Sequence, residues 1–157
     1  METLQLIQRK LVYNEWANRR ALESLQAMDT LSSRGVRALS HVLLVEKLWL
    51  ARLRREEMKL PPEFFPALRL PECSALIDEN LNGYQGYLGV VTEQGLDAVQ
   101  DFQTIKGDKY RLSIRDVLTH VMMHSMYHRG QVSLAIREDG GEPLQSDYSL
   151  FMRETSD

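Results

Sequence analysis

The chain has 157 residues, of which 43% are hydrophobic and 26% are charged, as is ordinary for a globular protein. Its net charge of −3 argues against nonspecific nucleic-acid binding, which needs a basic surface. No apolar stretch approaches the roughly 20 residues of a membrane span, and the N-terminus lacks the pattern of a secretory signal. The single cysteine cannot form an internal disulfide. We therefore expect one domain over residues 1–157, located in the cytoplasm.

The first predicted element is a helix over residues 3–28, where apolar residues recur at helical spacing. The same stripe passes through Asn14 and Asn18. Polar groups inside a core stripe are costly unless they are paired. Two interpretations therefore stay open: the asparagines lie at the wet edge of the buried face, or they lie beside a polar site in the centre of a bundle.

A second helix is predicted to start after Ser32-Ser33, with a serine as its N-cap, and to run to about Met58. Its apolar stripe has His41 beside it. The run of charged residues at 52–57 is typical of a solvated face, and we assign it no function. Glu46 is interpreted as an ordinary solvated acid.

Residues 59–73 break the helical pattern because they hold four of the five prolines. The segment also contains Phe64, Phe65 and Leu68, which need a surface to pack against. We therefore expect an ordered crossover rather than a linker between domains. A long crossover allows the helices on either side of it to run parallel.

The third helix is predicted over residues 74–94. Gly83, Gly86 and Gly89 recur along it at every third position, and each weakens a helix by about 1 kcal/mol relative to alanine. This stripe indicates either a close approach of another helix or an irregular helix.

Residues 101–112 have the composition of a short β-hairpin. A fourth helix is predicted from the capping box of Ser113 and Asp116 to about Asp139, where Gly140-Gly141 stops it. The tail beyond keeps enough apolar residues to pack back on the helices. The fold class is therefore predicted to be all-α, a four-helix bundle with a possible hairpin before its last helix.

The histidines are the main indication of function. All four lie in two helical segments: His41 in the second helix, and His120, His124 and His128 at successive turns of the fourth. A spacing of four residues places side chains on one face of a helix. The pairs 120/124 and 124/128 are equally good by spacing. One of these three histidines must do something else, because His120 and His128 are roughly 12 Å apart along the axis.

Imidazole is the commonest protein ligand for transition metals. A pair on one helix and a third histidine on another can form a site inside a bundle, and three neutral ligands leave an open coordination position typical of catalysis. Such a metal lowers the pKa of bound water or a bound thiol, or polarises a carbonyl. The alternative is that the histidines are hydrogen-bonded residues without a metal. Glu46 and Tyr127 are candidates for contacts outside the ligands.

Four motifs follow one another along the chain: Tyr13-Asn-Glu-Trp-Ala-Asn18, His41 with Glu46-Lys-Leu-Trp49, His124-Ser-Met-Tyr-His-Arg-Gly-Gln131, and Gly140-Gly-Glu-Pro143 with Asp147-Tyr148. With these motifs the chain resembles the DinB/YfiT-like family of metal-binding four-helix bundles. The resemblance implies a left-handed bundle with helices 2 and 3 parallel, usually a homodimer. It implies that His41, His124 and His128 hold zinc or nickel, with His120 as a neighbour.

The resemblance also implies a class of reaction, because relatives include enzymes that use a low-molecular-weight thiol. A metal-dependent thiol S-transferase acting on small electrophiles is the first hypothesis, with Asn18 or Arg129 as orienting groups. A metal-dependent hydrolase and a nonenzymatic metal-binding stress protein are the alternatives. Cys73 is interpreted as an apolar filler rather than a nucleophile.

Overall fold

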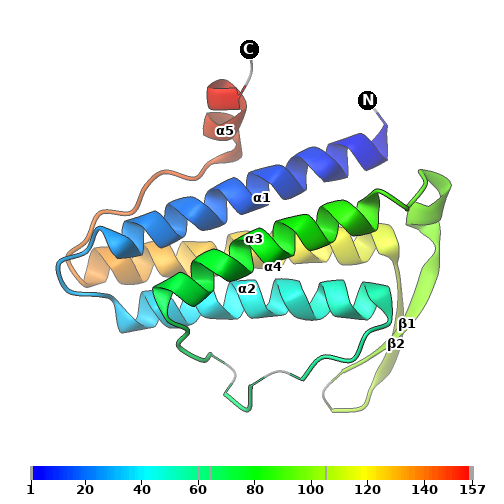
Figure 1. The fold of residues 1–157 in the computed structure, drawn as a ribbon, viewed down its shortest axis with the longest axis horizontal. Coiled ribbons are helices and arrows are strands. Elements are labelled where there is room, and N and C mark those ends of the chain that lie inside the picture. The colour runs from blue at the N-terminus through cyan, green and yellow to red at the C-terminus, as the bar shows by residue number, and fades with distance from the viewer. Residues whose placement is uncertain (1, 60, 64, 105, 156–157) are drawn as a thin grey trace.

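The protein is described by a computed structural model that covers residues 2–59, 61–63, 65–104 and 106–155; Phe64 lies outside them. Four long helices form a bundle, as predicted (Figure 1). They are α1 (Thr3–Gln26), α2 (Ser33–Arg54), α3 (Leu70–Leu88) and α4 (Ile114–Glu138). Helices α2 and α3 run parallel, and α1 and α4 run in the opposite direction (Figure 1). The long crossover between α2 and α3 makes this parallel arrangement possible.

A short 3₁₀ helix, η1 (Gln94–Asp97), and an antiparallel hairpin lie between α3 and α4. The hairpin consists of β1 (Val99–Gln103) and β2 (Lys109–Ser113), with Phe102 opposite Tyr110. The predicted hairpin is therefore confirmed. The tail ends in a short helix, α5 (Tyr148–Thr155), that packs on α1: the Tyr13 and Tyr148 rings are 5.0 Å apart and the Trp16 and Phe151 rings 5.6 Å apart.

Both predicted serine N-caps are confirmed. The Ser32 hydroxyl accepts a hydrogen bond from the amide of Gly35 at 3.0 Å, and the Ser113 hydroxyl accepts one from the amide of Asp116 at 3.1 Å. Each satisfies a backbone donor that has no partner within its helix.

Three predicted boundaries were wrong. Helix α2 ends at Arg54, four residues before Met58, because Arg55 takes a left-handed conformation with φ of 62°. Helix α3 begins at Leu70 rather than at residue 74: Pro71 lies in its first turn, where no amide donor is needed, and the Glu72 carboxylate accepts from the amide of Arg69 at 2.8 Å. The same helix ends at Leu88, six residues before the predicted end.

Gly83 is the glycine at which another helix approaches closely. A Cβ atom there would lie 2.3 Å from Cδ2 of Leu50 on α2, so any side chain at this position would force the Leu50 side chain to move. Arg54 also donates a hydrogen bond to the carbonyl of Gly83 at 2.8 Å. This contact favours the first of the two interpretations of the glycine stripe.

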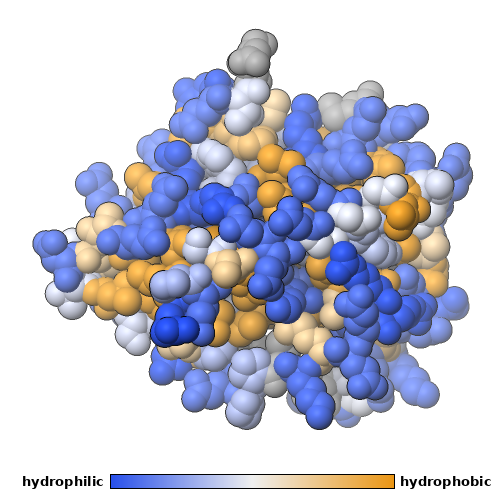
Figure 2. All heavy atoms as spheres, viewed as in Figure 1, coloured by the Kyte–Doolittle hydropathy of each residue, from blue (hydrophilic) through white to orange (hydrophobic). Residues whose placement is uncertain are grey.

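The core of the bundle consists of two apolar clusters with a polar layer between them. One cluster lies near the hairpin and includes Leu11, Leu53 and Leu88; the other lies at the opposite end and includes Leu25, Leu39 and Ile136. Hydrophilic residues cover most of the face in Figure 2, with hydrophobic patches between them. Across the described residues, every helix is too short or too polar to span a bilayer.

Candidate metal centre

The three histidines of the predicted triad come together between α2 and α4. One ring nitrogen of each of His41, His124 and His128 can be chosen so that all three atoms lie within 4.8 Å of one another. His41 and His128 are buried and His124 is half-buried. Helix α4 supplies its two members from adjacent turns, and α2 supplies the third from the facing helix.

The spacing of these nitrogens fits a transition metal. The Nε2 atoms of His41 and His124 are 3.3 Å apart. Two ligand nitrogens of a tetrahedral zinc, each about 2.0–2.1 Å from the ion, lie at about that separation. Burial, with a smaller effect of the neighbouring histidines, lowers the pKa of His124 to about 4. That ring is therefore neutral near pH 7, which is the form that binds a metal.

Gln131, Phe65 and Tyr127 are among the described side chains that contact the triad rings. The Nδ1 atom of His128 is 2.7 Å from Oε1 of Gln131, so the Gln131 amide can fix the ring and leave Nε2 free. Phe65 from the crossover stacks on His41, with ring centres 4.2 Å apart. Tyr127 meets His128 edge-on at 5.0 Å. Tyr127 was predicted to be such a neighbour, whereas Gln131 and Phe65 were given no role.

His120 lies outside the triad. It is exposed, and its ring contacts Trp49 at 5.2 Å and His124 at 5.7 Å. The pairs 120/124 and 124/128 were equivalent by spacing, and the second is the one that faces His41.

A buried polar layer lies beside the triad. Glu46 is only 3% exposed, so its interpretation as a solvated acid was wrong. Its carboxylate accepts five hydrogen bonds of 2.7–3.2 Å from side chains of the other three long helices. The donors are Asn14 and Asn18 of α1, Asn80 of α3 and Ser125 of α4. Asn14 and Asn18 are therefore buried in the bundle centre, the second of the two interpretations left open.

Arg129 completes this layer. Its guanidinium is 4% exposed and donates to the side-chain oxygens of Asn14 and Asn18 at 2.6 and 2.8 Å. The two asparagines thus bridge a buried positive charge to the buried negative charge of Glu46. Among the described residues, those that line the cavity beside His41 include neither Asn18 nor Arg129. The orienting role suggested for these two residues stays a prediction.

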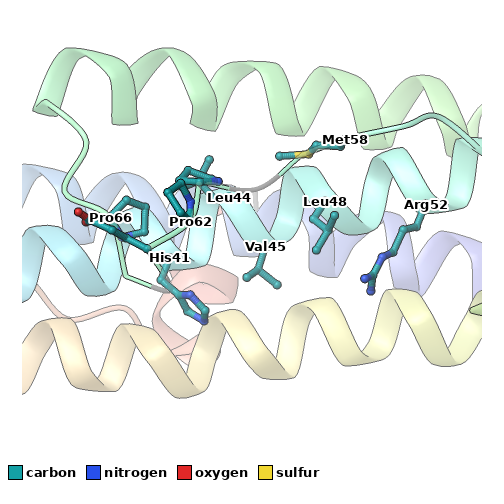
Figure 3. Close-up of a pocket in the computed structure, with 10 residues that line it drawn as sticks. His41, Leu44, Val45, Leu48, Arg52, Met58, Pro62 and Pro66 are labelled. Carbon is teal, nitrogen blue, oxygen red and sulfur yellow. The ribbon is translucent and has the colours of Figure 1, made fainter. Parts of the chain in front are cut away.

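A cavity of about 510 Å³ opens beside His41, between α2 and the crossover. Figure 3 shows His41, Val45 and Arg52 pointing to the same side of α2, toward α4. Arg52 was predicted to belong to a solvated face, but it is half-buried and lines this cavity. The remaining lining is largely apolar: Leu44, Val45, Leu48, Met58, Pro61, Pro62 and Pro66, with Glu63.

Cys73 is fully buried, and its sulfur lies 3.9 Å from the hydroxyl of Ser40. Burial raises the pKa of this thiol. A buried thiol with a raised pKa is a poor nucleophile, and Cys73 packs within an apolar cluster of the core.

Comparisons with known proteins agree with the fold. A model of the DinB family matches residues 5–157. Protein DinB of Bacillus subtilis (strain 168) is 22% identical over 154 residues, which cover 89% of this chain and 90% of that protein. The crystal structure of a conserved protein from Enterococcus faecalis matches with a TM-score of 0.57 and 15% identity, over 87% of this chain and 96% of that one, and so supports the fold. Since the family model matches almost the whole length, the chain belongs to the DinB family.

Proposed function

We propose that this protein is a metal-dependent thiol S-transferase that joins a low-molecular-weight thiol to a small electrophile. The observation that carries the proposal is the convergence of three histidine nitrogens within 4.8 Å, next to a cavity large enough for a small molecule. His41, His124 and His128 would hold zinc or nickel. When bound, the metal would supply the positive charge that lowers the pKa of the thiol.

The protein's own residues would hold and shield the reacting groups. Gln131 would keep the His128 ring oriented through its contact with Nδ1. Phe65, stacked on His41, would exclude water from one side of the triad. The cavity beside His41 would place the electrophile close to the thiol, so that the reaction gains from proximity.

Metal titration of single variants tests the ligand set. Replacing His41, His124 or His128 by alanine should remove most of the affinity for zinc or nickel, because two imidazoles bind less tightly than three. His120→Ala is the matched control. It should lower the metal affinity by no more than the roughly 10- to 100-fold expected for loss of a contact outside the ligands. Loss of binding in His120→Ala with retention in His128→Ala would move the site one turn along α4.

The reaction is tested with a panel of low-molecular-weight thiols and a chromogenic electrophile, with and without added metal. Product should form only when thiol and metal are both present, and the His124→Ala variant should be inactive. Cleavage of a chromogenic ester without thiol would instead indicate a hydrolase. Metal binding with neither activity would indicate a nonenzymatic metal-binding protein.

We also propose that two copies of the chain, each a single domain over residues 1–157, form a homodimer in the cytoplasm. Met123, Met126, Tyr127 and Leu134 follow one outer face of α4 and are 55–67% exposed, which is a large apolar surface to leave in water. The net charge of −3 gives no support for a nucleic-acid partner. Light scattering should give the mass of a dimer for the wild type and of a monomer for Met126→Glu.

A further inference from the structure

The cavity beside His41 contains a positive charge, that of Arg52, for which the described residues supply no counterion. In the described part of the chain, no carboxylate forms an ion pair with Arg52. The other charged residue of the lining, Glu63, pairs with Arg37 at 3.5 Å and points largely to solvent. A half-buried guanidinium next to apolar walls favours an anionic partner.

The Arg52 guanidinium is held in place by the core. Its Cζ atom lies over the ring of Trp49, 4.8 Å from the ring centre. Trp49 is itself buried, and its ring also packs against Phe102 of the hairpin. A guanidinium stacked on a fixed ring loses little freedom when it binds a carboxylate, because its planar donors are already oriented.

The position of Arg52 relative to the triad defines the shape of the occupant. His41 and Arg52 lie eleven positions apart on α2, which is an axial distance of about 16 Å between their backbones. The length of the arginine side chain makes the distance between its guanidinium and His41 shorter than this. The lining residues between them are aliphatic: Leu44, Val45 and Leu48. A ligand that spans the cavity from Arg52 to His41 therefore needs a polar end at Arg52, an apolar body along the aliphatic residues and a second end at the triad (Figure 3).

We propose that the electrophilic substrate is a small amphipathic anion, whose carboxylate or sulfonate binds Arg52 and whose apolar body lies along Leu44, Val45 and Leu48. This arrangement directs the opposite end of the substrate toward His41. The substrate role rests on the proposed transferase function, whereas the binding of the anion does not depend on the metal or on a thiol.

The test measures binding to metal-free protein by calorimetry, with decanoate as the anionic probe and decanol as its neutral counterpart. The wild type should bind decanoate more tightly than decanol. Arg52→Met should weaken decanoate binding about tenfold or more, the loss expected for a hydrogen bond to a charged group, and leave decanol within about twofold. Arg52→Lys keeps the charge and should retain an intermediate affinity.

Two further variants locate the effect. Lys59→Met removes a nearby exposed positive charge that does not line the cavity, and it should change neither affinity. Leu48→Trp fills the cavity and should abolish binding of both probes. Equal losses in Arg52→Met and Lys59→Met would show a general effect of charge and overturn the proposal. Failure of the wild type to bind decanoate, or unchanged binding in Arg52→Met, would overturn it as well.

These outcomes are distinct from failure of the proposed function. If thiol transfer is absent but decanoate binding depends on Arg52, the anion site stands and the reaction is different. If transfer occurs but Arg52→Met leaves decanoate binding intact, the transferase stands and the anion site is wrong.

Discussion

The buried charge of Glu46 leads to a prediction about stability. Replacing Glu46 by leucine would remove the negative charge that compensates Arg129 and would leave the donors of Asn14, Asn18 and Ser125 without their acceptor. Asn80 would keep only its hydrogen bond to the carbonyl of Leu43. Glu46 and Arg129 are 3% and 4% exposed, so water cannot replace the lost partner without opening the core. The variant should therefore be strongly destabilised.

The expected loss follows from the burial of both charges. Removing one member of a buried charge pair costs about 3–5 kcal/mol. For a chain of 157 residues this lowers the melting temperature by roughly 6–20 °C. Lys47→Met is the matched control, because Lys47 is the next residue and forms an exposed ion pair with Glu79 at 3.1 Å. This substitution should lower the free energy of unfolding by less than about 1 kcal/mol.

A double-mutant cycle separates this coupling from simple loss of packing. The free energies of unfolding of the wild type, Glu46→Leu, Arg129→Met and the double variant would be measured in urea on metal-free protein. The double variant should lose about 2 kcal/mol less than the sum of the two single losses, because it leaves neither charge uncompensated. Losses that add to within about 0.5 kcal/mol would refute the reasoning, since the two charges would then be independent.

Three further predictions follow from single contacts. Gln131→Ala should weaken zinc binding by about 10- to 100-fold through loss of the contact to Nδ1 of His128, and unchanged affinity in a chelator competition would contradict this. The unfolding free energy of metal-free protein should fall as pH drops from about 6.5 toward 4. In this range the unfolded chain takes up a proton at His124, whereas the native ring, with a pKa of about 4, does not. His124→Gln should flatten this pH dependence in urea titrations. Gly83→Val should cost about 1–3 kcal/mol of unfolding free energy by overpacking against α2, whereas Gly130→Ala, with open space around it, should cost nothing.

The four helices and two of their caps could be predicted because they depend on local sequence. Apolar residues at helical spacing mark the buried face, and Ser32 and Ser113 satisfy amides within three residues of themselves. The end of α2 could not be found in this way. Arg54, Arg55 and the acids that follow are good helix formers, and only the left-handed conformation of Arg55 ends the helix.

Glu46 was misread because its partners lie on three other helices. The pattern of α2 alone does not show that four side chains converge on this carboxylate. The signal was in α1, where Asn14 and Asn18 interrupt an apolar stripe and need a polar partner wherever that stripe is buried. Pairing these asparagines with the acid in α2 would have identified the polar layer.

The choice between His120 and His128 likewise depended on tertiary structure. Spacing on α4 makes both equal neighbours of His124. Which of them faces His41 is decided by where α2 lies against α4, and this depends on packing along both helices. The position of Arg52 at a cavity was hidden for the same reason, because the crossover that forms the other wall of that cavity lies beyond the end of α2.

The crossover between α2 and α3 shapes access to the histidines independently of the contacts that hold the four helices together. It covers His41 through Phe65 and forms one wall of the cavity through its prolines. Yet its described residues supply none of the side chains of the polar layer that joins the four helices. Substitutions of Pro61 and Pro62, which are exposed, can therefore reshape the cavity beside His41 without removing a hydrogen bond that joins the helices.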